Sequence, residues 1–288
     1  MGQAITLRLI DKGHQVQVWN RTPAKLTRLL EAGATAAATP RELAQNAEVV
    51  IAMLTNEHAQ EAVYQTPQTG LLAADVQGKL FIDMSTVRPH SSVALGEQLE
   101  ARGASYVESP VGGTTGPARE GKLFALVGAS DQAFARAEPL LKELCRRIEH
   151  VGPLGAGCSV KLAVNLPLLV FWQAFGEALS LVSHLDLAPE RLIDVLSDTP
   201  GASGGFKARA PQFVARLGGQ APFPASFNLL SIHKDLGLMR DEAGSRGVPL
   251  PVVNAAIAAY AEAIDHGHGD SDSIEQTLYW RAKAQASS

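Results

Sequence analysis

The chain has 288 residues, more than a single compact domain usually holds, and this length favours two domains that each bury a core. A composition of 46% hydrophobic and 19% charged residues, with a formal net charge of -4, is ordinary for a globular protein and argues against nucleic acid as a partner. The two cysteines, Cys145 and Cys158, are too few for a disulfide framework and too far apart for a clustered zinc site, so we expect a reducing, cytoplasmic location.

The first half of the chain alternates helical and strand-like patterns. Residues 3–12 have a helical pattern that stops at Gly13, and residues 16–19 have the pattern of a strand. Further helices are expected at 40–45, 92–102 and 132–145, and further strands at 48–54, 80–84, 105–108 and 122–127. This alternation predicts an α/β fold with a mostly parallel, doubly wound, Rossmann-like sheet.

The second half has only helical patterns. Helices are expected at 159–185, 188–196, 227–246 and 251–266, with Gly, Pro and Ser loops at 199–205 and 218–226, and a frayed tail after Trp280. We therefore divide the chain into a dinucleotide-binding domain, residues 1–153, and an all-helical domain for substrate binding and oligomerisation, residues 154–288.

No membrane segment is expected. The first residues lack a charged segment followed by a long apolar run. The most apolar later stretch, residues 162–175, contains Asn165, Pro167 and Gln173 and is shorter than the roughly 20 residues of a spanning helix.

The start of the chain lacks most of a glycine-rich phosphate turn. In doubly wound sheets such a turn connects the first strand to a helix whose N-terminus faces pyrophosphate. Here Met1 and Gly2 open directly into the first helix, as though a preceding strand and two glycines had been removed. We expect an internal methionine as the start, because a sheet without its central strand would leave neighbouring edges unpaired. Gly2 is then the remaining cofactor-binding glycine.

The residues after the 16–19 strand indicate which cofactor is bound. The end of this strand normally faces the adenosine ribose, where an acidic side chain accepts hydrogen bonds from a free 2′-hydroxyl. Asn20, Arg21 and Thr22 instead offer donors and a positive charge that suit a 2′-phosphate. They predict NADP(H) rather than NAD(H).

Six motifs in order resemble the β-hydroxyacid dehydrogenase family, which includes 3-hydroxyisobutyrate dehydrogenases and tartronate or succinic semialdehyde reductases. The resemblance runs from Met1 to about Ser273. The motifs are Met1-Gly2, the segment from Gly13 to Thr22, Asp83-Met84-Ser85-Thr86, Ser109-Pro110-Val111-Gly112-Gly113, the segment from Gly155 through Lys161 to Asn165, and Lys234-Asp235-Leu236. Each motif alone is weak, and their shared order makes the match specific.

Lys161 is the candidate catalytic residue. It follows a glycine-rich helix entry and lies four residues before Asn165, so both side chains share one helical face. A lysine shielded from water can have its pKa lowered toward working pH and donate a proton as a carbonyl is reduced. The resemblance implies this acid/base role for Lys161 and a substrate-orienting role for Asn165.

A loop rich in Gly and Thr is the candidate site for a substrate carboxylate. Backbone amides of residues 109–123 can form a concave anion site. Family members commonly have Ser-Gly-Gly where this chain has Gly112, Gly113 and Thr114, so one hydroxyl is missing and Thr114 or Thr115 is the candidate to replace it.

Other candidates lie at strand ends and in a late helix. Leu54 and Thr55 follow one strand and Thr86 follows another, where cofactor is expected, and Ser85 is assigned to substrate. The resemblance implies that Lys234 reaches toward the cofactor; a surface lysine that is solvated or paired with an aspartate is the alternative.

These observations predict a reductase that uses NADP(H) on a small aldehyde acid such as glyoxylate, succinic semialdehyde or tartronate semialdehyde. An imine reductase is the enzymatic alternative, although that group typically lacks a lysine at the position of Lys161. A non-catalytic dinucleotide-binding module is the other. The resemblance also implies a homodimer or homotetramer, with a small carboxylate as substrate. The eight histidines form no cluster with metal-ligand spacing, so no bound metal is expected.

Overall fold

The structure is a computed structural model that describes residues 1–286. The chain forms two compact units, Met1–Leu162 and Ala163–Ser288. The sequence placed the boundary after residue 153, before helix α8 (Ala156–Leu181), whereas this division falls within α8. The reason is local, because the first turn of α8 packs on strands of the first unit.

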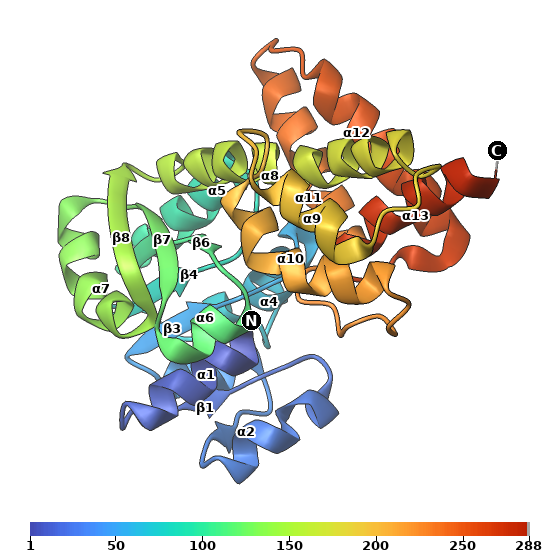
Figure 1. Cartoon of the computed structure of the whole chain (residues 1–288). Helices are drawn as coiled ribbons and strands as arrows, with labels where there is room; N and C mark the ends of the chain where they lie inside the picture. The colour runs from blue at the N-terminus through green and yellow to red at the C-terminus, as the bar shows by residue number, and fades with distance from the viewer. Residues whose placement is uncertain (287–288) are drawn as a thin grey trace. The chain divides into compact units, whose positions relative to one another are not determined.

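The main sheet of the first unit is mixed (Figure 1). Strands β3 (Val49–Ala52), β4 (Leu80–Asp83) and β5 (Ser105–Glu108) run parallel. Strand β7 (Leu123–Gly128) lies antiparallel to β5 and to the short β6 (Val111–Gly112), while β8 (Cys145–Gly152) runs parallel to β7. The doubly wound α/β fold is therefore confirmed.

Strand β8 was not predicted. Its sequence carries Arg146, Arg147 and Glu149 among few apolar residues, and most of its side chains are only partly buried. An outer strand needs no continuous apolar run, so the hydrophobic pattern that identified the central strands is absent here.

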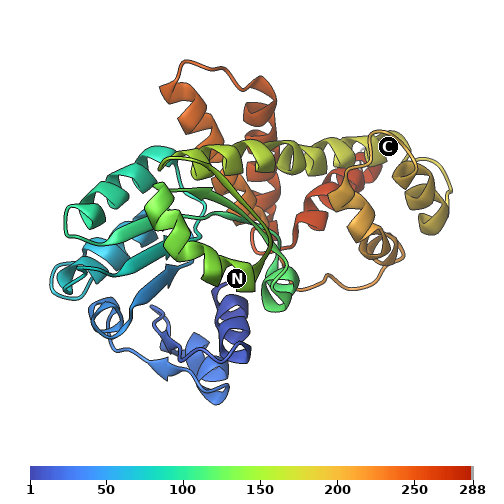
Figure 2. The same cartoon turned by 90° about the vertical axis from the view of Figure 1, so that its left-hand side faces the viewer.

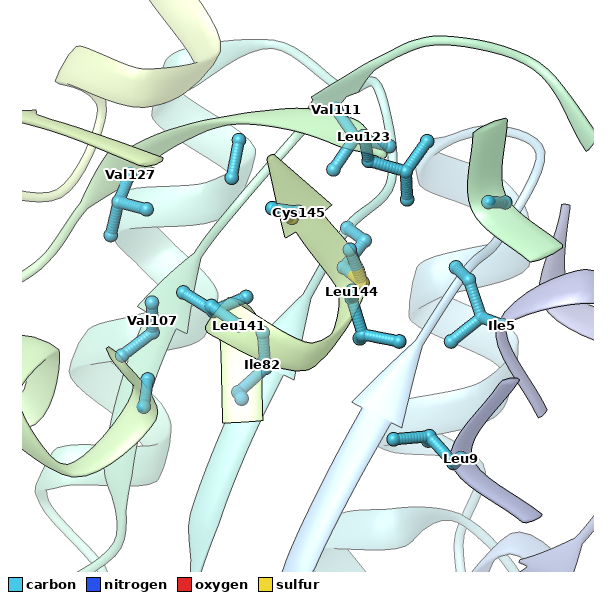
Figure 3. Packing of buried hydrophobic residues seen from close by; sticks show 14 of the residues in the cluster. Ile5, Leu9, Ile82, Val107, Val111, Leu123, Val127, Leu141, Leu144 and Cys145 are labelled. Carbon is cyan, nitrogen blue, oxygen red and sulfur yellow. The ribbon is translucent and has the colours of Figure 1, made fainter. Parts of the chain in front are cut away.

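Helices cover both faces of this sheet, since alternate strand residues enter two different cores. Ile82 and Val107 pack with helices α1 (Gly2–Asp11) and α7 (Asp131–Leu144), and Figure 3 shows this cluster around Leu141 and Leu144. Phe81 packs in a second core with helix α5 (Pro89–Glu100). The remaining helices of this unit are α2 (Thr27–Glu31), α3 (Pro40–Asn46), α4 (Glu57–Gln65) and α6 (Thr115–Glu120).

A separate two-stranded sheet lies at the start of the chain. Strands β1 (Gln17–Val18) and β2 (Thr35–Ala36) pair only with each other, and β3 is the end strand of the main sheet. Leu7 of α1 packs with Val18 in a small cluster of its own, in the segment drawn in blue in Figures 1 and 2. The Rossmann-like sheet is therefore interrupted between β1 and β3.

Among the described residues of the second unit, every regular element is a helix, as predicted. Besides most of α8, it contains α9 (Pro189–Ser197), α10 (Gly204–Leu217), α11 (Leu229–Ser245), α12 (Pro251–Ala263) and α13 (Ser273–Ala286). Its core is aromatic: the Phe175 ring is tilted against Phe206 and meets Phe213 edge-on, and Trp172 also contacts Phe213.

Two helices of this unit were missed. Helix α10 begins at two glycines, and the hydroxyl of Ser203 caps it by accepting from the amide of Phe206 at 3.0 Å. The expected fraying after Trp280 is wrong, because α13 continues to Ala286 and Lys283 pairs with Glu262 of α12.

Within residues 1–286, α8 is long and apolar enough to cross a membrane on those two criteria alone, with a mean hydropathy of 1.4. Core helices of globular proteins often have the same properties, so the absence of a membrane segment stays a prediction.

Candidate active site

The loops after β3 and β4 are tied together by a serine. The Ser85 hydroxyl accepts from the Leu54 amide at 2.8 Å, and the Ser85 amide donates to Asp83 Oδ1 at 2.9 Å. The structure thus brings Leu54 and Ser85 together at the carboxyl ends of neighbouring parallel strands, where doubly wound sheets bind ligands. Ser85 is 2% exposed and its oxygen is already bonded to the main chain, so contact with substrate stays a prediction.

An ion pair that the sequence did not reveal joins the same two loops. Glu57, in the first turn of α4, accepts from the Arg88 guanidinium at 2.9 and 2.8 Å and from the Arg88 amide at 3.0 Å. Burial opposes ionisation, but these bonds hold the pKa of Glu57 below its ordinary value. Thr55 and Thr86 lie on the two loops so fixed, Thr55 exposed and Thr86 half-buried.

The residues after β1 are exposed. The Thr22 amide donates to Asn20 Oδ1 at 2.9 Å, which forms a local turn, and Arg21 lies between them. Among residues 1–286, no acidic side chain pairs with Arg21 within ion-pair distance. Gly2 begins α1, whose first turn has no side-chain cap. An exposed cation after β1 and an uncapped first turn at the start of α1 fit the phosphates of a dinucleotide.

The glycine-rich loop is shaped by Gly113. This residue has φ of 124°, in the region that favours glycine, and a side chain there would lie 2.9 Å from Leu123 Cδ2. Gly112 pairs with Phe124 in the β6–β7 ladder, and Thr114 precedes α6 without capping it. The three candidates are contiguous, and their substrate contacts stay predictions.

Lys161 is a buried lysine. It lies on α8 within the first unit and is 6% exposed. The helix begins after Gly155, whose φ is 92°, and continues through Asn165. Lysine is seldom buried to this extent unless partners or a function hold it, so this position suits proton chemistry.

In the second unit, Asn165 and Lys234 meet on one aspartate. Asn165 Nδ2 donates to Asp235 Oδ2 at 3.2 Å, and Lys234 Nζ lies 2.7 Å from Asp235 Oδ1. Lys234 is therefore paired with an aspartate, which was the alternative to its contact with the cofactor. Asp235, 3% exposed, was quoted only as part of a motif, and its place beside Lys234 in the sequence was the available signal.

Two buried carboxyl groups were given no role in the sequence analysis, although Asp83 was quoted as part of a motif. Asp83 and Glu108 end β4 and β5 in direct register and are 2% and 1% exposed. Burial raises the pKa of Asp83, although hydrogen bonds from Ser85 and Gln60 act in the opposite direction. An acidic residue closing an otherwise apolar strand is the sequence signal that could have identified them.

Comparisons with known proteins agree with this geometry. Residues 1–152 match the family described as the NAD binding domain of 6-phosphogluconate dehydrogenase, and residues 155–279 match the NAD-binding domain of NADP-dependent 3-hydroxyisobutyrate dehydrogenase. The chain is 32% identical to glyoxylate/succinic semialdehyde reductase 1 of Arabidopsis thaliana, over 94% of this chain and 92% of that one. It is also 32% identical to 3-hydroxyisobutyrate dehydrogenase of Pseudomonas aeruginosa, over 97% and 95% of the two chains.

Solved structures share the fold of this chain. Psf3, in complex with NADP+ and 2-OPP, has a TM-score of 0.85 and 27% identity, over 97% of this chain and 96% of that one. An imine reductase from Myxococcus stipitatus has a TM-score of 0.63 at 18% identity, over 95% and 94% of the chains, and at that identity shows the fold alone. The chain belongs to the β-hydroxyacid dehydrogenase family, whose members are NAD(P)-dependent oxidoreductases acting on CH–OH groups.

Proposed function

We propose that the protein reduces a small aldehyde acid, such as glyoxylate, succinic semialdehyde or tartronate semialdehyde, with NADPH. The observation that carries the proposal is the burial of Lys161 in the second turn of α8. Burial shields this amine from water, and a proton donor shielded from water is what carbonyl reduction requires.

The reaction needs a hydride and a proton. NADPH, when bound, supplies the hydride that forms the new C–H bond at the carbonyl carbon. The Nζ of Lys161 donates the proton to the carbonyl oxygen, which becomes the hydroxyl, and the amine then regains a proton from solvent. The direction of reduction rests on cofactor preference, because NADPH usually serves reduction in cells.

Arg21 supports the choice of NADP(H) over NAD(H). Its guanidinium is exposed at the end of β1, the strand end that faces the adenosine ribose in doubly wound folds. A 2′-phosphate there would pair with this cation, and Asn20 and Thr22 fix the turn that presents it.

Two groups are proposed to bind and orient the substrate. The backbone of Gly112, Gly113 and Thr114 would receive the carboxylate. Asn165 would hydrogen-bond the reacting end of the substrate. Its side-chain amide is held by Asp235, to which Asn165 Nδ2 donates, and Asn165 Oδ1 would accept from the substrate.

We also propose a cytoplasmic homodimer or homotetramer. Val164 and Leu181 of α8 are 47% and 78% exposed, a pattern that suits packing between helical units of separate copies. A monomeric mass by light scattering would contradict this assembly.

The test is NADPH oxidation by the full chain against glyoxylate, the semialdehyde acids and cyclic imines. We expect turnover of an aldehyde acid and a loss of at least about 100-fold in kcat for Lys161→Ala, the usual contribution of a general acid. Lys142→Ala, which removes an exposed lysine of α7, is the control and should retain full activity.

Turnover of imines alone, or aldehyde turnover indifferent to Lys161→Ala, would favour the imine reductase alternative. Binding of NADPH without turnover of any substrate would favour a non-catalytic module. Arg21→Ala should raise the KM for NADPH and leave the KM for NADH nearly unchanged; an equal effect on both would remove Arg21 from cofactor selection.

A further inference from the structure

Glu108 is a buried carboxyl group that the reaction does not use. It ends β5, is 1% exposed, and belongs to the first unit, as does Lys161. We infer that Glu108 is a positioning residue, which caps the start of α8 and thereby sets the place of Lys161. The catalytic consequence rests on the proposed role of Lys161, whereas the capping contact does not.

The contact is a hydrogen bond to the main chain. Glu108 Oε1 accepts from the Cys158 amide at 3.1 Å, between residues 50 positions apart in the sequence. Helix α8 begins at Ala156, so Cys158 is its third residue, and an amide at that position has no acceptor within the helix. Glu108 therefore does for α8 what a capping serine or aspartate does for an ordinary helix.

Helix α8 has no capping side chain of its own. The residue before it is Gly155, which has no side chain, and the first helical bond runs from the Ser159 amide to the Gly155 carbonyl at 3.0 Å. Three other helices of this unit, α3, α4 and α7, are capped by a neighbouring side chain; in α7, for example, the Ser130 hydroxyl accepts from the Ala133 amide. The acceptor for α8 thus comes from the sheet, which makes the cap also an attachment between helix and strand.

The Glu108 carboxyl group is closely packed between the strand and the helix, with little free space around it. A side chain at Gly157 would lie 2.5 Å from the Leu126 carbonyl oxygen and 3.1 Å from Glu108 Oε1. A side chain at Gly128 would lie 2.2 Å from the same Glu108 oxygen. The carboxyl group therefore occupies the space that two glycines leave open, between β7 and the first turn of α8.

The charge of Glu108 also suits this place. Amides at a helix N-terminus carry partial positive charge, which stabilises an anion. The Cys158 thiol beside it is buried, and burial together with the Glu108 charge raises the pKa of that thiol well above its ordinary value, so it stays protonated. Through the Cys158 amide, the carboxyl group thus lies against the partial positive charge of the helix start.

Lys161 lies three residues after Cys158, on a neighbouring part of the helix surface. A shift of the first turn is passed directly to Lys161, because a helix moves as a stiff body over one turn. Misplacement of a reacting group by about 1 Å can cost about 100-fold in rate. The cap of α8 is therefore expected to act on kcat rather than on binding.

The test compares three variants of the full chain with the wild type. Glu108→Met keeps the size of the side chain but has no strong acceptor, and Glu108→Gln keeps a carbonyl acceptor at the same reach. Ser130→Ala removes the cap of α7, a helix that carries no proposed site residue. Each variant is measured by hydrogen exchange of residues 156–162 and by kcat and KM for the aldehyde and for NADPH.

We expect Glu108→Met to speed exchange in residues 156–162 about fivefold, the change that loss of one cap gives, and to lower kcat about 10- to 100-fold. KM values should change less than about threefold, because a cap on this turn acts on Lys161 rather than on uniform substrate binding. Glu108→Gln should restore both values to within about threefold of wild type, since its amide oxygen still accepts from the Cys158 amide. Ser130→Ala should speed exchange in α7 only.

Unchanged exchange in residues 156–162 for Glu108→Met would overturn the capping role, whatever the activity. Faster exchange with unchanged kcat in an active enzyme would overturn the positioning role alone. If the wild type has no aldehyde activity, the proposed function fails while the exchange result still decides the cap. Should Glu108→Met not fold, Glu108→Asp, which withdraws the carboxylate by one carbon, is measured in its place and should show the same pattern.

Discussion

The two units hold their buried polar side chains in different ways. In the first unit, Ser85 and Glu108 bond to main-chain amides, those of Leu54 and Cys158. In the second, buried acids pair with basic side chains: Asp235 with Lys234, Asp272 with Arg209, and Glu275 with Arg216. A main-chain amide partner survives every substitution of its residue except proline, whereas loss of one member of a buried charge pair leaves the other without its opposite charge. The first unit should therefore tolerate substitution around its polar groups better than the second.

The largest effect is expected from Arg209→Ala. Asp272 keeps hydrogen bonds from Ser226 and Ile274 but loses its charged partner, so the second unit should lose about 3 kcal/mol of unfolding free energy, the low end for a broken buried pair. Urea unfolding followed by hydrogen exchange of each unit would measure this. Arg240→Ala, which breaks an exposed pair with Asp241 in the same unit, is the control and should cost less than about 1 kcal/mol. Equal losses for the two variants would contradict the comparison.

A smaller loss of unfolding free energy, equal in the two units, is expected when a serine cap at the start of a helix is removed. Ser130 caps α7 in the first unit and Ser203 caps α10 in the second, each by accepting from an amide three residues later. Ser130→Ala and Ser203→Ala should each cost about 1 kcal/mol in the unfolding free energy of their own unit. A clearly larger loss for Ser203→Ala would mean that the second unit is fragile in general, rather than at its charge pairs.

The smallest expected effect is on the pH dependence of stability, because Asp83 in the first unit and Asp272 in the second change the unfolding free energy in opposite directions as the pH falls. Burial raises the pKa of Asp83 above 3.8, so its protonation favours the folded first unit as the pH falls through that raised value. In Asp272 burial acts the same way, but bonds from Ser226 and Arg209 prevail and hold its pKa below 3.8; its contribution is present above 3.8 and is lost as the pH falls through the lowered value.

The second unit should therefore unfold first on acidification. In a Trp19→Phe variant, only Trp172 and Trp280 report by fluorescence, and both lie in the second unit. Their transition should precede the loss of strand signal in circular dichroism. Coincident transitions would show that the two units respond to acid together.

The hydrophobic pattern located the parallel strands and the change to an all-helical second half, because these strands are short, largely apolar runs, and β4 is buried at all four positions. It failed for β8, whose charged residues face outward, and for α10, whose glycines and Pro211 resemble a loop. Helix α10 depends on the aromatic core around Phe206 and Phe213, a tertiary contact that no local pattern contains.

Candidate site residues that belong to sequence motifs were predicted, whereas those defined by contacts between distant parts of the chain were missed. Lys161, Asn165 and Lys234 were identified from spacing and resemblance. Glu108 and Asp235 were not, because their roles depend on partners 50 and 70 positions away in the sequence. Such contacts become visible only when the chain is folded.

Helix α1 belongs to two cores at once. Ile5 and Leu9 pack into the main core, while Leu7 packs with Val18 beneath the two-stranded sheet. The small sheet can therefore open as a separate cooperative unit, at a free energy below that of global unfolding, while α1 stays docked by its other face. A ligand that contacts both the end of β1 and the start of α1 would make that opening more costly in proportion to its occupancy, so this corner of the molecule would report cofactor binding through its amide protection.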